Sequence, residues 1–209
     1  MATTRPVSPR TVAQRIVRAD PAFATVVKAA GPFQPRPPST DAFNALARAI
    51  VFQQLAGRAA TAIHGRFVAL FEGADPTPEA TLAIPPERLR SAGLSGNKTA
   101  AIVDLALKCT DGTVPLDGLD GIEDDEVVAR LSVVRGIGRW TAEMFLLFDL
   151  HRADVWPVDD LGVRKGWMLI HRQDDMLKPR ELMVAGEPLR PHRSAAAWYC
   201  WRAVDTLTP

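Results

Sequence analysis

Two short segments carry residue types whose spacing could support chemistry. The first runs from Val133 to Glu143, where Gly136 and Gly138 flank a single isoleucine just before a predicted helix. Glycines permit backbone conformations with positive φ and leave the main-chain amides accessible. Amides at the N-terminus of a helix attract an anion such as a phosphate, because the helix dipole is positive there. An ordinary glycine turn between two helices has the same spacing, so the pattern alone leaves both interpretations open.

The second segment runs from Pro157 to Asp160 and leads into a predicted helix at Leu161. A carboxylate at the start of a helix commonly caps the amides of the first turn. A carboxylate held beside a reacting sugar can instead stabilise the positive charge that develops as a glycosidic bond breaks. Taken alone, the pair Asp159-Asp160 favours capping by both residues.

The elements that must position these segments are helices. Apolar residues recur at three- and four-residue steps, strand patterns are scarce, and proline-rich stretches over 31–38 and 76–78 separate the helical segments. Thr40 or Asp41 can cap a helix with an apolar face made of Phe43, Leu46, Ala47 and Ile50. Further helices are predicted over 86–92, 98–108, 124–133, 140–150, 161–170 and 193–204. The sequence therefore predicts an all-α fold.

The charge distribution favours a polyanionic partner. Residues 1–66 hold nine Lys and Arg against two Asp, a net charge of +7, although the whole chain carries only +1. Residues 111–126 hold seven acidic residues and no basic one. A nucleic acid needs one basic face on its partner rather than a basic total. A solvated surface with uneven charge accounts for the same counts, so this feature alone does not decide.

The two cysteines, Cys109 and Cys200, lie far apart and form no Cys-x-x-Cys motif. This excludes a four-cysteine metal or iron–sulfur site and is typical of a reduced, intracellular protein. The sequence shows neither a basic-then-apolar leader nor an apolar run of the ~20 residues that span a bilayer. We therefore expect a cytoplasmic, nucleoid-associated protein that binds no membrane.

Taken together, Gly-Ile-Gly-Arg-Trp-Thr-Ala over 136–142 and Pro-Val-Asp-Asp over 157–160 resemble the motifs of the helix-hairpin-helix (HhH-GPD) DNA glycosylases. In that family, a Gly-x-Gly hairpin is followed downstream by a carboxylate at the start of a helix. Within the family, the sequence resembles the 3-methyladenine DNA glycosylase II (AlkA-like) type. The resemblance spans residues 42–202 and includes Arg48-Ala49-Ile50, Gln53-Gln54-Leu55, Gly93-Leu94, Lys98 and Trp201.

The resemblance implies two helical subdomains with the active-site cleft between them. One comprises residues 42–152 and contains the helix-hairpin-helix over about 127–150. The other combines residues 1–41 with 153–209 and carries the catalytic aspartate.

The resemblance also implies that Asp160 is the catalytic residue. The family's carboxylate is followed three positions later by an aliphatic residue that faces the core. Counted from Asp160, that residue is Val163, whereas Asp159 leads to a glycine. We therefore expect Asp160 to act on the substrate and Asp159 to cap the helix.

The implied reaction is hydrolysis of the N-glycosidic bond of an alkylated purine, such as 3-methyladenine or 7-methylguanine, after the base has left the duplex stack. The alkylated base already carries positive charge, so a single carboxylate that stabilises the cationic sugar and orients water suffices. At Trp140, bifunctional relatives place a lysine that forms a Schiff base with the abasic sugar. Tryptophan cannot act as that nucleophile, so we expect a monofunctional glycosylase without β-lyase activity.

The remaining site residues follow from the resemblance. A cationic base is attracted to an electron-rich aromatic wall, and the implied pocket residues are Trp201, Trp140 and Met144. The implied DNA-binding residues lie on the hairpin and on one turn in the first half of the chain: Gly136, Ile137, Gly138, Arg139, Thr141, Gln53, Gln54 and Leu55. No cofactor is expected, apart from a structural Na⁺ or K⁺ bound by the main-chain carbonyls of Ser132, Val134 and Ile137.

Some positions depart from the family pattern. Gln54, beside Leu55, occupies the position of the intercalating wedge, where the family often has an aliphatic residue. Ala56 replaces a helix-capping serine, and Met144 replaces an aromatic residue of some relatives. These departures leave the identity of the wedge and the preferred lesion open.

Two other classes of function remain open. A non-catalytic binder of damaged or abasic DNA could use the same scaffold, although retention of Asp160 argues against it. A helical protein–protein module could carry the Gly-Ile-Gly turn for purely structural reasons. The resemblance favours the enzyme, and we expect a monomer whose partner is double-stranded DNA with alkylated bases.

Overall fold

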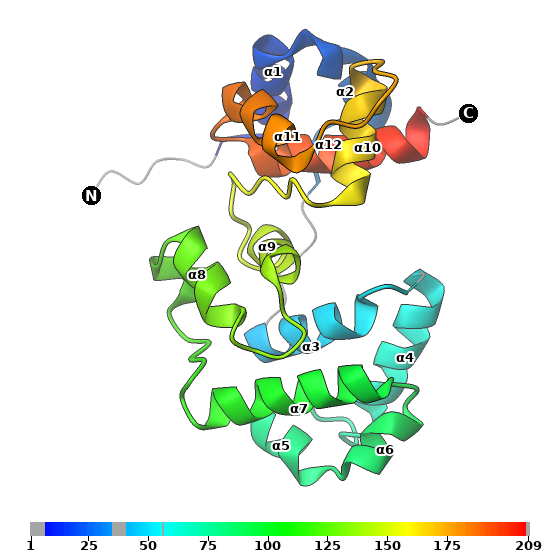
Figure 1. Cartoon of the computed structure of the whole chain (residues 1–209), viewed down its shortest axis with the longest axis vertical. Coiled ribbons are helices and arrows are strands. Elements are labelled where there is room, and N and C mark those ends of the chain that lie inside the picture. The colour runs from blue at the N-terminus through cyan, green and yellow to red at the C-terminus, as the bar shows by residue number, and fades with distance from the viewer. Residues whose placement is uncertain (1–6, 35–40, 56, 208–209) are drawn as a thin grey trace. The chain divides into compact units, whose positions relative to one another are not determined.

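The computed structural model of the chain describes residues 7–34, 41–55 and 57–207 (Figure 1). Within these residues every regular element is a helix, so the predicted all-α fold is confirmed. None of these helices is both long and apolar enough to cross a membrane. The chain divides into two compact units, one made of Met1–Arg36 with His151–Pro209 and the other of Pro37–Leu150. The sequence predicts these divisions at 41/42 and 152/153, and the expected cleft between the subdomains stays a prediction.

The unit formed by residues 37–150 is built around α3. Its described α-helices are α3 (Ala42–Phe52), α4 (Gly57–Ala69), α5 (Pro78–Ala83), α6 (Pro86–Ser91), α7 (Gly96–Thr110), α8 (Asp124–Leu131) and α9 (Arg139–Phe148). α3 is capped by Asp41, whose Oδ1 accepts the Asn44 amide at 2.7 Å, and the alternative cap, Thr40, lies outside the described residues. The buried side chains of α3 pack against α4, α7 and α9. This packing places the end of α3 next to the start of α9.

The other unit joins the two ends of the chain. Its described α-helices are α1 (Pro9–Ala19), α2 (Ala24–Ala30), α10 (Leu161–Ile170), α11 (Pro179–Ala185) and α12 (Arg193–Thr206). α10 has the predicted bounds, and the other predicted helices differ from the observed ones by one or two residues at their ends. The sequence did not predict α1, α2, α5 or α11. Three of these are short, and helices of that length depend on tertiary packing rather than on their own propensity.

α10 and α12 approach each other closely at Gly166. A Cβ atom at this position would lie 2.0 Å from the carbonyl oxygen of Cys200, so only glycine permits the observed backbone approach. Val163 and Trp167 on α10 and Tyr199 on α12 are buried around this crossing. The contact fixes α10, which begins just after Asp160, against the helix that carries Trp201.

We expect Gly166→Ala to lower the free energy of unfolding by about 2 kcal/mol or more, because the added methyl group collides with backbone. Gly65→Ala is the matched control, since Gly65 lies within α4 and a Cβ atom there would meet no atom within 4 Å. Alanine there should stabilise the helix by up to about 1 kcal/mol. Urea unfolding of both variants measures the difference, and equal effects of the two substitutions would contradict the close crossing.

Candidate active site

Asp160 is the N-cap of α10. Its backbone is extended (φ −70°, ψ 121°), and its Oδ1 accepts the amide of Val163 at 2.8 Å. The expectation that Asp159 caps the helix is wrong, because the N-cap is Asp160 and Asp159 lies one residue before it, exposed. The first helical residue is Leu161, and the cap is the residue directly before it. Val163 is fully buried, as its position relative to Asp160 predicts.

Trp201 holds the same carboxylate from α12. Its indole Nε1 donates a hydrogen bond to Asp160 Oδ1 at 2.9 Å. Gly162 makes this contact possible, because a Cβ atom there would lie 2.7 Å from Trp201 Cδ1. Two donors from two helices therefore converge on one oxygen and orient the Asp160 side chain. The structure thus brings together the predicted catalytic residue and one predicted pocket residue.

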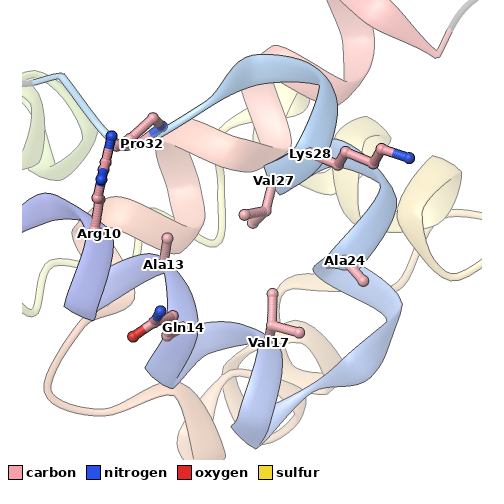
Figure 2. A pocket seen from close by; sticks show the side chains of 8 residues that line it. All are labelled: Arg10, Ala13, Gln14, Val17, Ala24, Val27, Lys28 and Pro32. Carbon is pink, nitrogen blue, oxygen red and sulfur yellow. The ribbon is translucent and has the colours of Figure 1, made fainter.

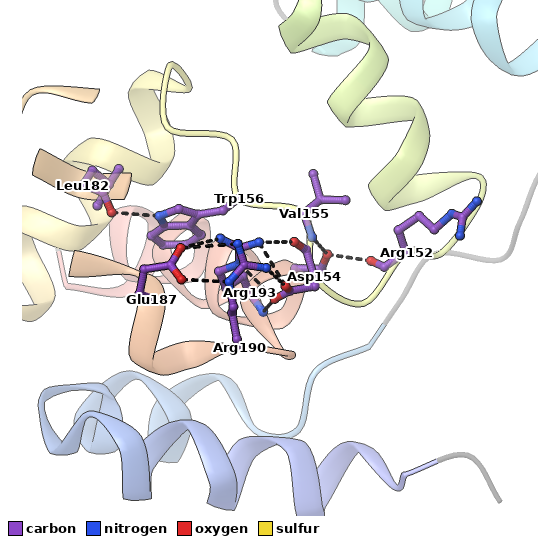
Figure 3. Close-up of polar contacts among 9 residues, drawn as sticks. Arg152, Asp154, Val155, Trp156, Leu182, Glu187, Arg190 and Arg193 are labelled. Atoms are coloured by element: carbon purple, nitrogen blue, oxygen red, sulfur yellow. Dashed lines mark hydrogen bonds and ion pairs between the residues drawn. The ribbon is translucent and has the colours of Figure 1, made fainter. Parts of the chain in front are cut away.

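The loop that leads to α10 is clamped by the first residues of α12 (Figure 3). The buried guanidinium of Arg193 donates to both carboxylate oxygens of Asp154 at 2.9 Å. The hydroxyl of Ser194 donates to the Arg152 carbonyl at 2.6 Å and accepts the Val155 amide at 2.9 Å. The helix that supplies the indole therefore also holds this loop.

Sequence reasoning missed this clamp. Arg193 and Asp154 are 39 residues apart and belong to no motif, so only their opposite charges could have suggested the pair. Trp156 extends the clamp by donating from Nε1 to the Leu182 carbonyl at 2.9 Å. Breaking such buried, charge-assisted hydrogen bonds is costly, because a charge is left without its partner. The loop is therefore held by contacts that a local pattern cannot reveal.

The predicted hairpin joins α8 to α9. Gly136 has a φ of +77°, in the left-handed region that favours glycine, and its Cβ would lie 3.3 Å from Ala101 Cβ on α7. Gly138 has φ −98° and ψ 178°, so of the two hairpin glycines only Gly136 uses the positive φ that glycine permits. Extended backbone is open to any residue, and a Cβ at Gly138 would meet no atom within 4 Å. Ile137 is buried, as expected for a residue that packs between the two helices.

The main-chain amides of the hairpin are partly used by the chain itself. The Arg135 amide donates to Asp104 Oδ2 at 2.7 Å, and the Ile137 amide donates to the Val134 carbonyl at 3.1 Å. Gly138 caps α9 without a side-chain hydrogen bond, so no side chain covers the first turn from the cap position. The dipole of this ten-residue helix is positive at its N-terminus, where the sequence predicts the anion site.

Gln53 and Thr141 lie together between α3 and the hairpin. Gln53 Nε2 donates to the Gly136 carbonyl at 2.8 Å and to Thr141 Oγ1 at 3.0 Å. Thr141 is only 4% exposed, so its side chain faces the interior of the unit, and its contact with DNA stays a prediction. Both side chains support the hairpin from inside the unit.

The turn after α3 projects two predicted DNA-binding residues. Gln54 is exposed and adopts a left-handed φ of 55°, and Leu55 is 38% exposed. Lys98 on α7 donates to the carbonyl of Gln53 at 2.8 Å. Ala56, where the family has a capping serine, lies outside the described residues.

α9 presents the remaining predicted side chains. Trp140 is 40% exposed, and Met144 is half-buried one turn later, so the two lie on the same face of the helix. The Arg139 side chain is 57% exposed and forms ion pairs with Asp125 at 3.4 Å and with Glu143 at 3.6 Å. The Asp125 side chain is 90% exposed, and an exposed ion pair of this length contributes little to stability, whereas Glu143 is only 10% exposed.

A pocket of about 460 Å³ lies between α1 and α2 (Figure 2). Its floor contains small apolar side chains such as Ala13 and Val17, and its lining includes the basic residues Arg10 and Lys28. None of its lining residues is a carboxylate, and Asp160 is not among them. The pocket is therefore separate from the arrangement around Asp160.

Comparison with known proteins assigns the family. Residues 47–191, more than half of the chain, match the HhH-GPD superfamily of base excision DNA repair proteins. The chain belongs to the HhH-GPD superfamily. The resemblance seen in the sequence is thereby confirmed, and α8, the hairpin and α9 lie within the matched region.

Relatives within the HhH-GPD superfamily cover most of the chain. It is 34% identical over 187 residues to DNA-3-methyladenine glycosylase 1 of Schizosaccharomyces pombe, which covers 88% of this chain and 82% of the relative. A solved 3-methyladenine DNA glycosylase from that organism, in complex with abasic DNA, has a TM-score of 0.84 and 34% identity and covers 91% of this chain and 94% of that one. The DNA-3-methyladenine glycosidase of Bacillus halodurans also has a TM-score of 0.84, with 33% identity, and covers 96% and 91%.

The monovalent cation expected at the HhH-GPD hairpin would use carbonyl oxygens of Ser132, Val134 and Ile137. The Val134 carbonyl already accepts the Ile137 amide, which uses one of its two lone pairs. Among the described residues, no group of three or more His, Cys, Asp or Glu side chains could hold a metal ion. The cation site therefore depends on main-chain oxygens alone and stays a prediction.

Asp104 links the stability of the HhH-GPD hairpin to pH. Burial acts to raise the pKa of Asp104, but the hydrogen bond from the Arg135 amide and the Lys108 ammonium outweigh it, so the pKa lies below its usual value. A carboxyl group with a lowered folded-state pKa stabilises the fold above its unfolded pKa and loses this contribution as the pH falls through the folded value.

We therefore expect Asp104→Ala to lower the free energy of unfolding most near neutral pH. The difference from the wild type should shrink as the pH falls below about 4, because the unfolded chain binds a proton at Asp104 before the folded wild type does. Urea unfolding of both proteins across this range measures it. A difference that stays constant from neutral pH to about pH 3 would contradict the proposed contribution of the Asp104 charge.

Proposed function

We propose that the chain is a monofunctional DNA glycosylase of base excision repair. It hydrolyses the N-glycosidic bond of alkylated purines, of the 3-methyladenine and 7-methylguanine type, in duplex DNA after the base has flipped out. The observation that carries the proposal is the Asp160 carboxylate, held by the Val163 amide and the Trp201 indole at the position of the family's catalytic residue. Relatives named for 3-methyladenine, at up to 34% identity, support the substrate class.

The chemistry needs one negative charge near the sugar. As the bond between C1′ and the alkylated purine breaks, its electron pair leaves with the base and positive charge develops on the sugar. The Asp160 carboxylate stabilises that charge and orients the water that attacks C1′. The proton of the water passes to the carboxylate or to solvent. No acid is needed for the leaving group, because the alkylated purine leaves as a neutral base.

The pocket selects a cationic base through aromatic contact. The Trp201 ring lies directly beside the carboxylate through its indole hydrogen bond, so one residue both orients Asp160 and offers a ring face. The family resemblance adds Trp140 and Met144 on α9 to the proposed pocket residues. An aromatic face favours a cationic base over a neutral one by on the order of 1–2 kcal/mol when the contact is desolvated. Trp140 also replaces the lysine of bifunctional relatives, which supports the absence of lyase activity.

The hairpin and the turn after α3 bind the DNA strand. The first-turn amides of α9 approach a phosphate, and Gly138 leaves room for it because a Cβ atom there would meet nothing within 4 Å. Ile137 secures the hairpin from inside, and Arg139 adds charge at the surface. Exposed Gln54 and Leu55 fill the gap left by the flipped base. We propose that the protein acts as a monomer, with Na⁺ or K⁺ at the hairpin carbonyls.

Asp160→Asn tests the catalytic role. Asparagine keeps an oxygen that can accept the hydrogen bonds from Val163 and Trp201, so the fold and DNA binding should persist. Removal of the charge should slow base release by about 100-fold or more. Asp159→Asn is the matched control, because Asp159 is exposed one position away, and it should release base like the wild type.

The measurement is chromatography of bases freed from an alkylated duplex, with strand breaks scored before and after alkali. We expect breaks only after alkali, since no Schiff base forms. Near wild-type turnover by Asp160→Asn would refute the assignment. Binding of an abasic duplex by the wild type without any base release would favour the non-catalytic binder instead.

Gly138→Ala tests the phosphate contact. The substitution should lower the free energy of unfolding by no more than about 1 kcal/mol, because the new methyl group meets no atom of the chain although alanine is a poorer N-cap than glycine. It should weaken duplex binding, because the methyl group blocks the approach of a phosphate to the first-turn amides of α9, and it should leave the salt dependence nearly unchanged, since no charge is removed. Gly121→Ala, also at an open glycine of the same unit, is the control and should bind normally. Unchanged duplex binding by Gly138→Ala would place the phosphate elsewhere.

A further inference from the structure

Gln53 ties the turn after α3 to the hairpin. Its Nε2 has two hydrogens, and both are used, one by the Gly136 carbonyl at 2.8 Å and one by Thr141 Oγ1 at 3.0 Å. A carbonyl oxygen can only accept a hydrogen bond, so the nitrogen of the Gln53 amide must face Gly136. The two acceptors belong to the hairpin turn and to the first turn of α9. One side chain therefore holds both parts of the hairpin.

Lys98 holds the same turn from α7. Its Nζ donates to the Val51 carbonyl at 2.6 Å and to the Gln53 carbonyl at 2.8 Å. These carbonyls lie at the C-terminal end of α3, where a helix has no partners of its own for them. Partial burial of the ammonium lowers its pKa. The orientation of the peptide group between Gln53 and Gln54 is thus fixed by a charged donor.

The residue that follows is in a strained conformation. Gln54 is not a glycine, yet its φ is 55°, a conformation that costs roughly 1 kcal/mol or more and persists only where the surroundings impose it. The contacts of Gln53 and Lys98 impose it directly before Gln54. The side chains of Gln54 and Leu55 consequently project from a turn that cannot relax independently of the hairpin.

We propose that Gln53 and Lys98 are positioning residues that lock the turn over 53–55 to the hairpin. Phosphate binding by the hairpin is then coupled to unstacking of the base by the turn. This inference rests on the proposed function and adds two residues that contact no DNA. Gln53, which the sequence places among the DNA-binding residues, acts through the turn and the hairpin instead.

The variants are chosen to keep shape and remove donors or acceptors. Gln53→Met and Lys98→Met keep long side chains without hydrogen-bond donors, and Thr141→Val keeps the volume without the acceptor oxygen. Thr141→Ser retains that oxygen and should not show the defect of Thr141→Val. Asp104→Ala is the matched control, because Asp104 supports the hairpin through the Arg135 amide and has no contact with the turn over 53–55 in the described structure.

The probe is a duplex with a tetrahydrofuran abasic analogue and 2-aminopurine opposite it, beside an undamaged duplex of the same sequence. Fluorescence of 2-aminopurine at saturating protein reports unstacking and needs no catalysis. Single-turnover base release from an alkylated duplex, also at saturation, reports the reaction. Titration of the undamaged duplex reports the grip of the hairpin by itself.

We expect Gln53→Met, Lys98→Met and Thr141→Val to lose most of the fluorescence gain and about tenfold in the saturated rate of base release, the effect of one or two hydrogen bonds. Their affinity for the undamaged duplex should change little. Asp104→Ala should instead lower the affinity for both duplexes by the same factor and keep the gain in 2-aminopurine fluorescence at saturating protein. A merely structural role would not produce this split between saturated rate and affinity.

The inference is overturned if Gln53→Met keeps the full fluorescence gain and the full rate of base release. It is also overturned if the fluorescence gain and the rate of Gln53→Met recover at saturating protein, as expected for Asp104→Ala. If Gln53→Met does not fold, the pair Thr141→Val and Thr141→Ser decides by the same readouts. A wild type that unstacks the probe but releases no base would refute the proposed reaction, while the fluorescence arm would still decide the coupling. A wild type that binds without unstacking would refute the coupling itself.

Discussion

One carboxylate oxygen is the point on which the proposed chemistry depends. Asp160 Oδ1 accepts a main-chain amide from α10 and an indole N–H from α12, so two helices define where the charge lies. The same hydrogen bond to Val163 caps α10, which means that the residue proposed for catalysis also begins the helix that carries it. A side chain held in this way needs no reorganisation when positive charge develops beside it.

The rest of this unit serves that geometry. Gly162 makes room for the indole, and Gly166 brings the backbones of α10 and α12 together. Arg193 at the start of α12 fixes the loop that leads to Asp160, so a single helix controls the loop and the carboxylate. Two glycines and one ion pair with a buried guanidinium thus fix the position of Asp160.

The unit formed by residues 37–150 follows a different principle, in which side chains from other helices satisfy main-chain groups of the hairpin. Asp104 accepts a hydrogen bond from the Arg135 amide, and Gln53 donates one to the Gly136 carbonyl. Gly138, the N-cap of α9, makes no side-chain hydrogen bond. The structure therefore distinguishes two glycines that look equivalent in the sequence. Gly136 is required by its own backbone, whereas Gly138 has an ordinary extended backbone and open space where a side chain would lie.

The sequence by itself determined the helical class, the bounds of α10 and the position of the glycine turn between α8 and α9, because these depend on local periodicity and on motifs. Tertiary structure decided which aspartate caps α10 and which of the two hairpin glycines has a backbone conformation that requires glycine. It also decided that the side chains of Gln53 and Thr141 form a hydrogen bond with each other. It also revealed the clamp between Arg193 and Asp154. Some of these features are contacts between residues far apart in the chain, and the others depend on backbone conformation and on the space around a Cα atom. Features of either kind produce no periodic pattern in the sequence.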